Sequence, residues 1–217
     1  MPLNIAIDGP AGAGKSTIAK LIAKKKNLIY VDTGAMYRAV ALYILRKGTD
    51  TDNADEVAKT ARETDITIKY EDGVQVVYLN GENVNAFLRT EEVGNTASKT
   101  SANPAVREHL LNLQRKLAKE NDCIMDGRDI GTVVLPDAQL KVFLTASSDV
   151  RAKRRFDELV AKGETPDFEK IKADIEQRDY QDMHREIAPL KQADDAKLVD
   201  TSDMNIEQVV DTICDLI

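Results

Sequence analysis

Short apolar runs alternate with helical stretches over the first fifty residues of the chain. Residues 3–7 and 28–31 are apolar runs of the length that buried strands have. Residues 17–26 and 35–47 repeat apolar side chains at helical spacing, and Gly48 is a natural stop after the second stretch. This strand–helix–strand–helix order predicts a parallel sheet with helices packed on both faces.

The pattern changes over residues 60–99. Residues 66–70 and 74–79 are rich in β-branched residues and are separated by Glu71-Asp72-Gly73, which is typical of a hairpin turn. Asn80-Gly81 gives a second turn signal. We therefore predict that residues 60–99 form an insert with a small antiparallel sheet, and that residues 1–59 and 100–217 form the core.

The rest of the chain, from about residue 100 onward, returns to single strands and long helices. Asn103-Pro104 has the residue types of an N-cap and a first helical position, so a helix is expected to run to about residue 121. Strands are expected at residues 123–125, 140–144 and 197–200, and helices at 149–162, 167–185 and 205–217. The predicted class is an α/β three-layer P-loop fold: a central parallel sheet flanked by helices, a small antiparallel insert and a helical lid at about residues 150–170.

The composition narrows the possible binding partners and the expected cellular location. With 217 residues and 42% hydrophobic side chains, the chain is suited to one compact domain with a sizeable core. Its net charge of −7 disfavours a nucleic acid partner, and no apolar run approaches the ~20 residues of a membrane span. Two distant cysteines and two histidines disfavour a disulfide framework or a zinc site. We expect a cytoplasmic monomer without a signal peptide, a nucleic acid partner or a membrane partner.

One loop carries a specific phosphate-binding motif. Gly9-Pro10-Ala11-Gly12-Ala13-Gly14-Lys15-Ser16 matches the G-x-x-x-x-G-K-[ST] pattern and lies between a predicted strand and a predicted helix. Glycines allow the backbone amides to turn inward around phosphate oxygens, and the helix N-terminus adds a partial positive charge. We expect Lys15 to reach the β- and γ-phosphates of ATP and the Ser16 hydroxyl to bind Mg²⁺.

Two further polar motifs follow predicted strands. Asp32-Thr33-Gly34-Ala35-Met36-Tyr37-Arg38 comes after the second strand, and Asp126-Gly127-Arg128-Asp129-Ile130-Gly131-Thr132 comes after the third. Ligands of open α/β sheets bind at the carboxyl ends of the strands. Both motifs are therefore candidates for an acceptor site, although a surface position for Arg38 is the simpler alternative.

Arginines gather on two helical faces near the C-terminal end of the chain. Arg151, Arg154 and Arg155 share one face by their spacing, and Arg178 and Arg185 share another with Asp182. A mobile segment with such guanidinium groups could close over a triphosphate and exclude water. The alternative is that these arginines lie on solvated helix faces and pair with Asp and Glu.

Four runs, taken in order, resemble bacterial cytidylate kinases: IAIDGPAGAGKST, VDTGAMYR, DGRDIGTVV and QRDYQDMHREIAPL. The resemblance spans nearly the whole chain. It implies a nucleoside monophosphate kinase core, an antiparallel insert in the acceptor-binding region, and transfer of the γ-phosphate of Mg·ATP to CMP or dCMP.

The resemblance also implies roles for individual residues. Lys15, Arg38, Arg128 and Arg185 are the implied catalytic residues, and the last three clamp the CMP phosphate. Cytosine is read by Ser98, Arg107 and Asp129, and the sugar side is contacted by Arg178 and Asp182. The implied ATP contacts are Gly9 through Thr17 (including Pro10, Ala11, Gly12, Ala13, Gly14, Lys15 and Ser16) with Arg151, Arg154 and Arg155, and the CMP site further includes Thr33, Tyr37 and Asp126.

Two other classes of function stay open from the residues alone. One is a kinase that acts on a different small acceptor, either another monophosphate or a hydroxyl metabolite. The other is a nucleotide-dependent switch without catalysis, which would bind ATP but show no acceptor-dependent ADP release. A guanine-reading Asn-Lys-x-Asp run is absent from the sequence, which disfavours a GTPase switch.

Overall fold

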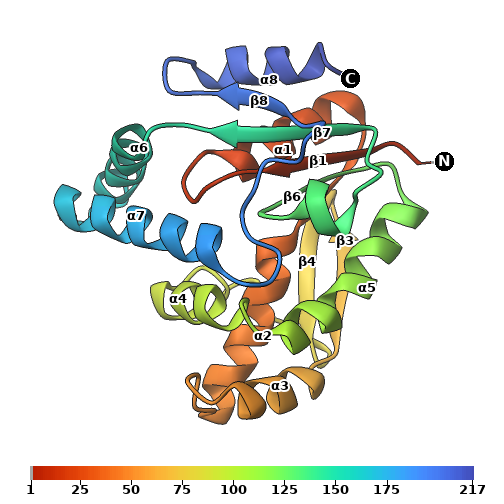
Figure 1. Ribbon diagram of the computed structural model, residues 1–217, viewed down its shortest axis with the longest axis vertical. Helices are drawn as coiled ribbons and strands as arrows, with labels where there is room; N and C mark the ends of the chain where they lie inside the picture. Colours follow the sequence, from red (N-terminus) through yellow and green to blue (C-terminus); the bar gives the residue numbers. More distant parts are fainter. Residues whose placement is uncertain (1) are drawn as a thin grey trace. The chain divides into compact units, whose positions relative to one another are not determined.

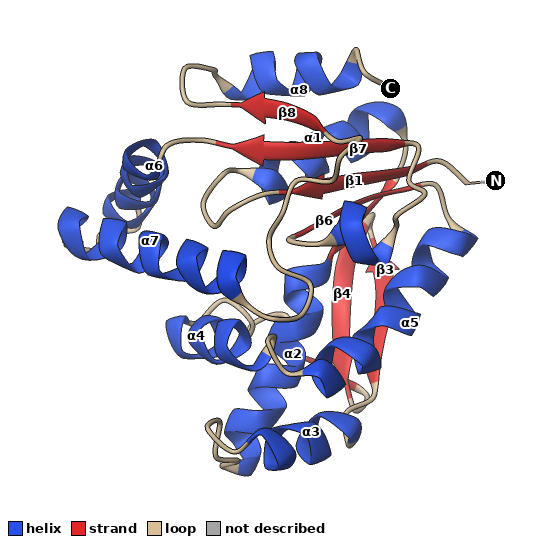
Figure 2. Ribbon diagram, viewed as in Figure 1, coloured by secondary structure: helices blue, strands red, loops and turns tan. Residues whose placement is uncertain are grey.

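The computed structural model describes residues 2–217 and contains two β-sheets (Figures 1 and 2). The larger sheet has the strand order β2-β6-β1-β7-β8, and the smaller has the order β3-β4-β5. Strand β7 pairs in parallel with β1 and β8, whereas β4 pairs antiparallel with β3 and β5. The predicted α/β class with a central parallel sheet and a small antiparallel sheet is therefore confirmed.

The strands of the larger sheet are short, and all but β6 end at a residue with a polar side chain. They are β1 (Asn4–Asp8), β2 (Ile29–Asp32), β6 (Cys123–Gly127), β7 (Leu140–Thr145) and β8 (Lys197–Asp200). The smaller sheet has β3 (Ile66–Glu71), β4 (Val74–Leu79) and β5 (Glu82–Asn83).

Helices make up most of the remaining structure. They are α1 (Lys15–Lys26), α2 (Thr33–Lys47), α3 (Ala54–Arg62), α4 (Glu91–Thr100), α5 (Pro104–Glu120), α6 (Ser148–Ala161), α7 (Phe168–His184) and α8 (Ile206–Cys214). A single π-helical turn, η1, covers Ile130–Val134. Within residues 2–217, every helix is too short or too polar to cross a bilayer.

The chain separates into two compact units. One is formed by Ile29–Cys123, and the other by Leu3–Leu28 together with Ile124–Ile217. We call them the acceptor unit and the P-loop unit, after the predicted role of the motifs in each. The division into a core and an insert at residues 60–99 stays a prediction.

Two tight hairpins shape the small sheet of the acceptor unit. Asp72 and Gly73, between β3 and β4, have φ values of 50° and 75°. Asn80 and Gly81, between β4 and β5, have φ values of 49° and 84°. Positive φ at both central residues is the geometry that matches the twist of paired strands, and Asn, Asp and Gly tolerate it best. The two predicted strands and their connecting turn are confirmed.

The sequence expectations omitted three elements of the acceptor unit: α3, α4 and β5. The two helices are short, with 9 and 10 residues, and each contains a single large apolar side chain, Val57 in α3 and Val93 in α4. Their caps were the better signal: Asn53 accepts a hydrogen bond from the Glu56 N–H, and Thr90 accepts one from the Val93 N–H.

In the P-loop unit, side-chain contacts join neighbouring helices. Lys25 of α1 forms an ion pair with Asp211 of α8 at 2.7 Å. Phe156 of α6 and Phe168 of α7 meet edge to face, with ring centroids 6.2 Å apart. The β1 residues Ile5 and Ile7 are fully buried. A packed core thus supports the loop that follows β1.

The capping box of α8 gives a direct test of local stability. The Asn205 side chain accepts a hydrogen bond from the Gln208 N–H, and the Gln208 side chain accepts one from the Asn205 N–H, both at 2.9 Å. Asn205→Ala should lower the free energy of unfolding by about 1 kcal/mol, because the Gln208 N–H loses its acceptor. Urea denaturation measures this change. Asn205→Ser keeps an acceptor oxygen and should lose much less; an equal loss in both variants would contradict the role of the cap.

Candidate active site

The loop after β1 has a backbone that requires glycine at its first position. Gly9 has a φ of 151°, and a Cβ on this residue would lie 1.9 Å from the Leu144 carbonyl oxygen. No side chain fits at that distance. Gly14, at the start of α1, has a φ of 89°, which is left-handed. The predicted phosphate loop thus has the backbone shape that turns amides inward.

Lys15 folds back over this loop. Its Nζ donates hydrogen bonds to the carbonyl oxygens of Gly9 and Pro10, both at 2.7 Å, and the residue is only 6% exposed. Burial, together with the nearby positive charge of Arg128, lowers the pKa of Lys15 to about 7, against the opposing effects of Asp126 and Asp8. An added anion at the loop would stabilise the charged form of this lysine.

Ser16 and Asp126 meet beside Lys15. The Ser16 hydroxyl donates to an Asp126 carboxylate oxygen at 2.8 Å, and Asp126 is 5% exposed. A hydroxyl and a carboxylate side by side form the kind of oxygen pair that P-loop enzymes direct at Mg²⁺. From the sequence, Asp126 is expected to bind the CMP acceptor. In the structure its carboxylate contacts Ser16, the last residue of the phosphate-loop motif.

Asp8, the last residue of β1, caps the π-helical turn η1. Its two carboxylate oxygens accept from the Ile130 N–H at 2.8 Å and from the Gly131 N–H at 2.7 Å. Asp129 occupies the N-cap position of η1 but makes no side-chain cap bond there. The carboxylate of another strand therefore satisfies the first amides of η1. Burial raises the pKa of Asp8 to about 6, although the two amides oppose this shift.

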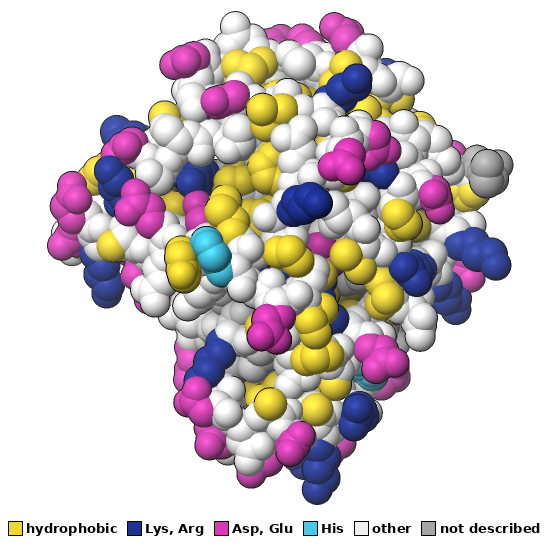
Figure 3. All heavy atoms as spheres, in the orientation of Figure 1, with side chains coloured by type: hydrophobic (Ala, Val, Ile, Leu, Met, Phe, Trp, Pro, Cys, Tyr) yellow, Lys and Arg dark blue, Asp and Glu magenta, His cyan; other side chains and the backbone are white. Residues whose placement is uncertain are grey.

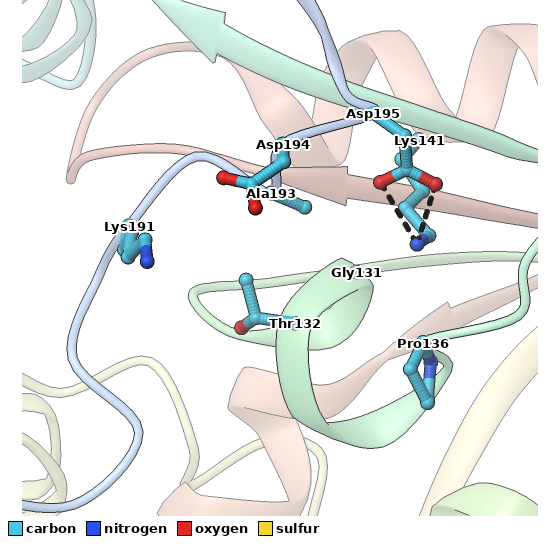
Figure 4. A pocket seen from close by; sticks show the side chains of 8 residues that line it. All are labelled: Gly131, Thr132, Pro136, Lys141, Lys191, Ala193, Asp194 and Asp195. Atoms are coloured by element: carbon cyan, nitrogen blue, oxygen red, sulfur yellow. Dashed lines mark hydrogen bonds and ion pairs between the residues drawn. The ribbon is translucent and has the colours of Figure 1, made fainter.

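A second set of contacts supports η1 from the side of β7 (Figure 4). Lys141 is 8% exposed, and its Nζ contacts both carboxylate oxygens of Asp195, at 2.9 and 2.8 Å. Its aliphatic stem would lie 3.2 Å from a Cβ on Gly131, so this position has little room for a side chain. The pair lines a hollow of about 350 Å³ together with Gly131 and Thr132. Figure 4 shows how these residues lie.

Asp182 of α7 holds two of the predicted acceptor arginines. One of its oxygens accepts from Arg128 Nε at 2.8 Å, and the other lies 3.8 Å from Arg185 Nη1. Arg185 also lies 3.3 Å from Asp129 and donates to the Ala188 carbonyl at 2.6 Å. Burial alone would lower the pKa of Arg128, but the charge and hydrogen bond of Asp182 raise it above the ordinary value.

The three predicted lid arginines of α6 have different surroundings. Arg151 is buried: it donates to the Ala11 carbonyl of the phosphate loop at 2.8 Å and pairs with Asp179 at 2.6 Å. Arg154 contacts the hydroxyl and the carbonyl of Thr201, at 3.1 and 2.7 Å. Arg155 pairs with Glu158 at 2.9 Å on the surface. Asp179, which also accepts from the Ala11 N–H at 3.3 Å, was not predicted from the sequence.

The acceptor unit holds the other predicted acceptor residues. Tyr37 of α2 lies under Arg107 of α5, with the guanidinium carbon 5.5 Å from the ring centroid. Arg107 is 8% exposed and also donates to the Ser101 carbonyl at 3.3 Å. Thr33 and Arg38 lie on α2, and Ser98 lies on α4.

The two units thus divide the predicted site residues between them. In the P-loop unit, Ser16 contacts Asp126, and Asp182 links Arg128 to Arg185, which also contacts Asp129. Lys15 is bonded to the loop carbonyls, Arg178 lies on α7 with Asp182, and Arg185 is the C-cap of this helix. The remaining residues, Thr33, Tyr37, Arg38, Ser98 and Arg107, belong to the acceptor unit. That Arg38 joins Arg128 and Arg185 on one phosphate stays a prediction.

A sequence model of one protein family, described as cytidylate kinase, matches residues 5–217. The chain belongs to the cytidylate kinase family. It is 50% identical over 214 residues to the cytidylate kinase of Caldicellulosiruptor saccharolyticus, covering 99% of this chain and 95% of that protein. It is 52% identical over 209 residues to the cytidylate kinase of Streptococcus agalactiae, covering 96% and 92%. The chain is therefore a kinase of this family along nearly its full length.

Solved structures of more distant proteins agree on the fold. A shikimate kinase from Bacteroides thetaiotaomicron aligns with a TM-score of 0.50 at 16% identity, covering 99% of this chain and 97% of that one. An uncharacterized protein from Eubacterium ventriosum aligns with a TM-score of 0.55 at 14% identity, over the same shares. At such low identity these likenesses show a shared fold and nothing of the acceptor.

The buried carboxylate of Asp8 should make stability depend on pH. Its pKa is about 6 when folded and 3.8 in the ordinary state, so its protonated form favours folding. This stabilisation is complete below the ordinary pKa and is lost as the pH rises through about 6, by up to about 3 kcal/mol. Relative to Asp8→Asn, the free energy of unfolding of the wild-type chain should therefore fall between pH 3.8 and a pH of about 6 and stay level above it.

Urea denaturation at several pH values measures this difference, and the carboxyl-carbon chemical shift of Asp8 gives an independent titration. A wild-type-minus-variant difference that stays flat with pH, together with an Asp8 shift that titrates near its ordinary pKa, would show that Asp8 is not perturbed by burial.

Proposed function

We propose that this chain transfers the γ-phosphate of Mg·ATP to CMP or dCMP, giving ADP and CDP or dCDP. The observation that carries the proposal is the family match over residues 5–217. It is supported by the contacts of Lys15, Ser16 and Asp126 at the end of β1 and β6, where a P-loop kinase needs its phosphate-binding groups.

The donor side rests on the phosphate loop. Loop amides and the N-terminus of α1 supply partial positive charge, and Lys15 supplies a full one. In this structure the Lys15 ammonium is bonded to the loop's own carbonyls. Binding of ATP would exchange these carbonyls for phosphate oxygens and hold the lysine protonated, with Arg151 bracing the loop through Ala11.

The residues present fit a nucleotide-bound Mg²⁺. Among residues 2–217, no cluster of three or more His, Cys, Asp or Glu side chains could hold a metal without other ligands. The Ser16 hydroxyl and the Asp126 carboxylate, 2.8 Å apart, would provide two oxygens for the ion, and phosphate oxygens and water would provide the others. Bound there, Mg²⁺ would neutralise charge on the transferring phosphate.

The proposed acceptor contacts follow the family resemblance, residue by residue. We propose that Arg128 and Arg185 bind the CMP phosphate together with Arg38, and that Arg178 and Asp182 contact the sugar. Asp129 would accept a hydrogen bond from the exocyclic amino group of cytosine, with Arg107 and Ser98 completing the base site. The CMP phosphate is already anionic at neutral pH, so alignment and charge stabilisation can drive the transfer without a strong general base.

The proposed partners are limited to small molecules. On the face seen in Figure 3, Lys and Arg side chains are interspersed with Asp and Glu, and the net charge is −7. This supports the proposal that ATP and CMP, rather than nucleic acid, are bound. Cys123 and Cys214 are buried free thiols, in keeping with the cytoplasmic setting that we propose for a monomer.

Replacement of Lys15 tests the donor side. Lys15→Ala should lower kcat by about a hundredfold or more, because one preorganised cation on the transferring phosphate is lost. Steady-state ADP release measures the loss, and circular dichroism checks that the fold is intact. Lys24→Ala, on the exposed side of the same helix, is the matched control and should keep wild-type turnover. A folded Lys15→Ala enzyme with a near wild-type rate would contradict the scheme.

A panel of acceptors tests the substrate. With ATP and Mg²⁺, ADP release should be fastest with CMP or dCMP and slower with UMP and AMP. UMP presents an acceptor oxygen where cytosine has its amino group, so the Asp129 carboxylate would lose its donor. About 1–3 kcal/mol per contact, or a factor of about ten to a hundred in kcat/KM, is expected. Equal rates with all four monophosphates would exclude cytosine recognition, and no acceptor-dependent release would favour a non-catalytic switch.

A further inference from the structure

Asp32 lies at the junction between β2 and α2, immediately before the predicted acceptor residues of α2. It is 6% exposed, and its carboxylate caps α2 by accepting from the Ala35 N–H at 2.9 Å. Its backbone is held as well. The Gln75 side chain accepts from the Asp32 N–H at 2.9 Å and donates to the Asp32 carbonyl at 3.1 Å. One side-chain amide thus makes the pair of bonds that a neighbouring strand would make.

Gln75 is itself fixed from two sides. Its backbone pairs with Tyr70 in the antiparallel β3–β4 ladder. Its carbonyl also accepts a hydrogen bond from the Asn85 amide at 3.2 Å, while the Asn85 oxygen accepts from the Val77 N–H at 2.9 Å. Tyr70 makes a further link to β2, because its hydroxyl donates to the Tyr30 carbonyl at 3.1 Å. The small sheet is therefore a rigid base for the Gln75 amide.

Arg89 completes the environment of Asp32. Its Nη2 lies 2.9 Å from an Asp32 carboxylate oxygen, with the arginine side chain 61% exposed and the aspartate side chain 9% exposed. Arg89 directly precedes Thr90, the N-cap of α4, and α4 carries Ser98. The ion pair therefore ties the beginning of α2 to the beginning of α4.

The Arg38 side chain lies close to the same point. A Cβ on Gly34 would be 3.2 Å from Arg38 Nη1 and also 3.2 Å from an Asp32 carboxylate oxygen. The Arg38 guanidinium thus folds back along α2 towards its N-terminus, which is the usual direction of a long helical side chain. A shift of Asp32 would move the first turn of α2, against which this guanidinium rests.

We propose that Gln75 and Arg89 are positioning residues for the acceptor: through Asp32 they hold the first turn of α2 and the start of α4 in the geometry that binds the monophosphate. The inference rests on the proposed phosphorylation of CMP. Neither residue needs to touch the substrate. Both lie in the acceptor unit, so their loss should affect acceptor binding and leave the donor side unchanged.

Steady-state kinetics of four variants tests the inference. Gln75→Ala removes both bonds to the Asp32 backbone and should raise KM for CMP by about tenfold. Gln75→Glu keeps the acceptor for the Asp32 N–H but faces the Asp32 carbonyl with a carboxylate, so a similar rise is expected. Arg89→Ala should raise KM for CMP a few-fold. Arg89→Lys keeps a positive charge for Asp32, so its KM for CMP should lie between those of Arg89→Ala and the wild type. KM for ATP should stay within about twofold of wild type in all four.

Two control variants match these substitutions. Arg46→Ala breaks an ion pair with Glu82 at 2.6 Å, which also joins α2 to the small sheet but at the other end of the helix. Gln139→Ala removes another glutamine that accepts from a backbone N–H, that of Asn4 at 2.7 Å. Neither control should change KM for CMP.

The outcomes separate this inference from the proposed function. If the wild-type enzyme uses CMP and the Gln75 and Arg89 variants show unchanged KM for CMP, the positioning role is wrong. It is equally wrong if KM for CMP and KM for ATP rise together with a fall in Tm, because that pattern indicates general destabilisation. If the wild-type enzyme prefers another monophosphate, the proposed acceptor is wrong. The positioning role is then tested by comparing KM for that monophosphate with KM for ATP in the same variants.

Discussion

The structure of the P-loop unit depends on the pairing of buried charges at the ends of β1 and β6. Asp8, Lys15, Asp126 and Asp129 are all less than a tenth exposed. An unpaired ion in such surroundings would cost several kcal/mol, so each needs a partner. The Asp8 carboxylate accepts hydrogen bonds from two backbone amides, and the Lys15 ammonium donates hydrogen bonds to two backbone carbonyls. These hydrogen bonds tie the buried charges to backbone groups of the loop and of η1, so the charges and the local backbone hold each other in place.

The same pairing prepares the unit for anions. Arg128 is held through Nε by Asp182, yet a guanidinium has five N–H donors in a fixed fork. A phosphate can therefore be bound by the remaining donors of such a group without releasing the carboxylate. The orientation of the side chain is fixed before the ligand arrives, which reduces the entropy and reorganisation that binding and transfer would otherwise cost.

Sequence patterns predicted the elements whose signals are local. The parallel strands, the hairpin at Asp72-Gly73 and the phosphate loop each follow from residues adjacent in the chain, and each is present in the structure. The contacts that were missed join distant residues. Asp8 caps a turn 122 positions away, and Gln75 binds the backbone of Asp32 across 43 positions. A lone aspartate or glutamine carries no local sign of such a role, because the partner is a backbone group that any residue has.

An acidic chain that handles two phosphate-bearing substrates looks contradictory until the aspartates are placed. Asp179 pairs with Arg151, Asp182 with Arg128, and Asp32 with Arg89, all at 2.6–2.9 Å. These carboxylates serve as internal partners that orient cations. Charges elsewhere on the surface are screened over about 8 Å at physiological salt, so the net charge of −7 has little influence inside a site lined by guanidinium groups. Local arrangement, which the overall composition does not report, decides the affinity for phosphate.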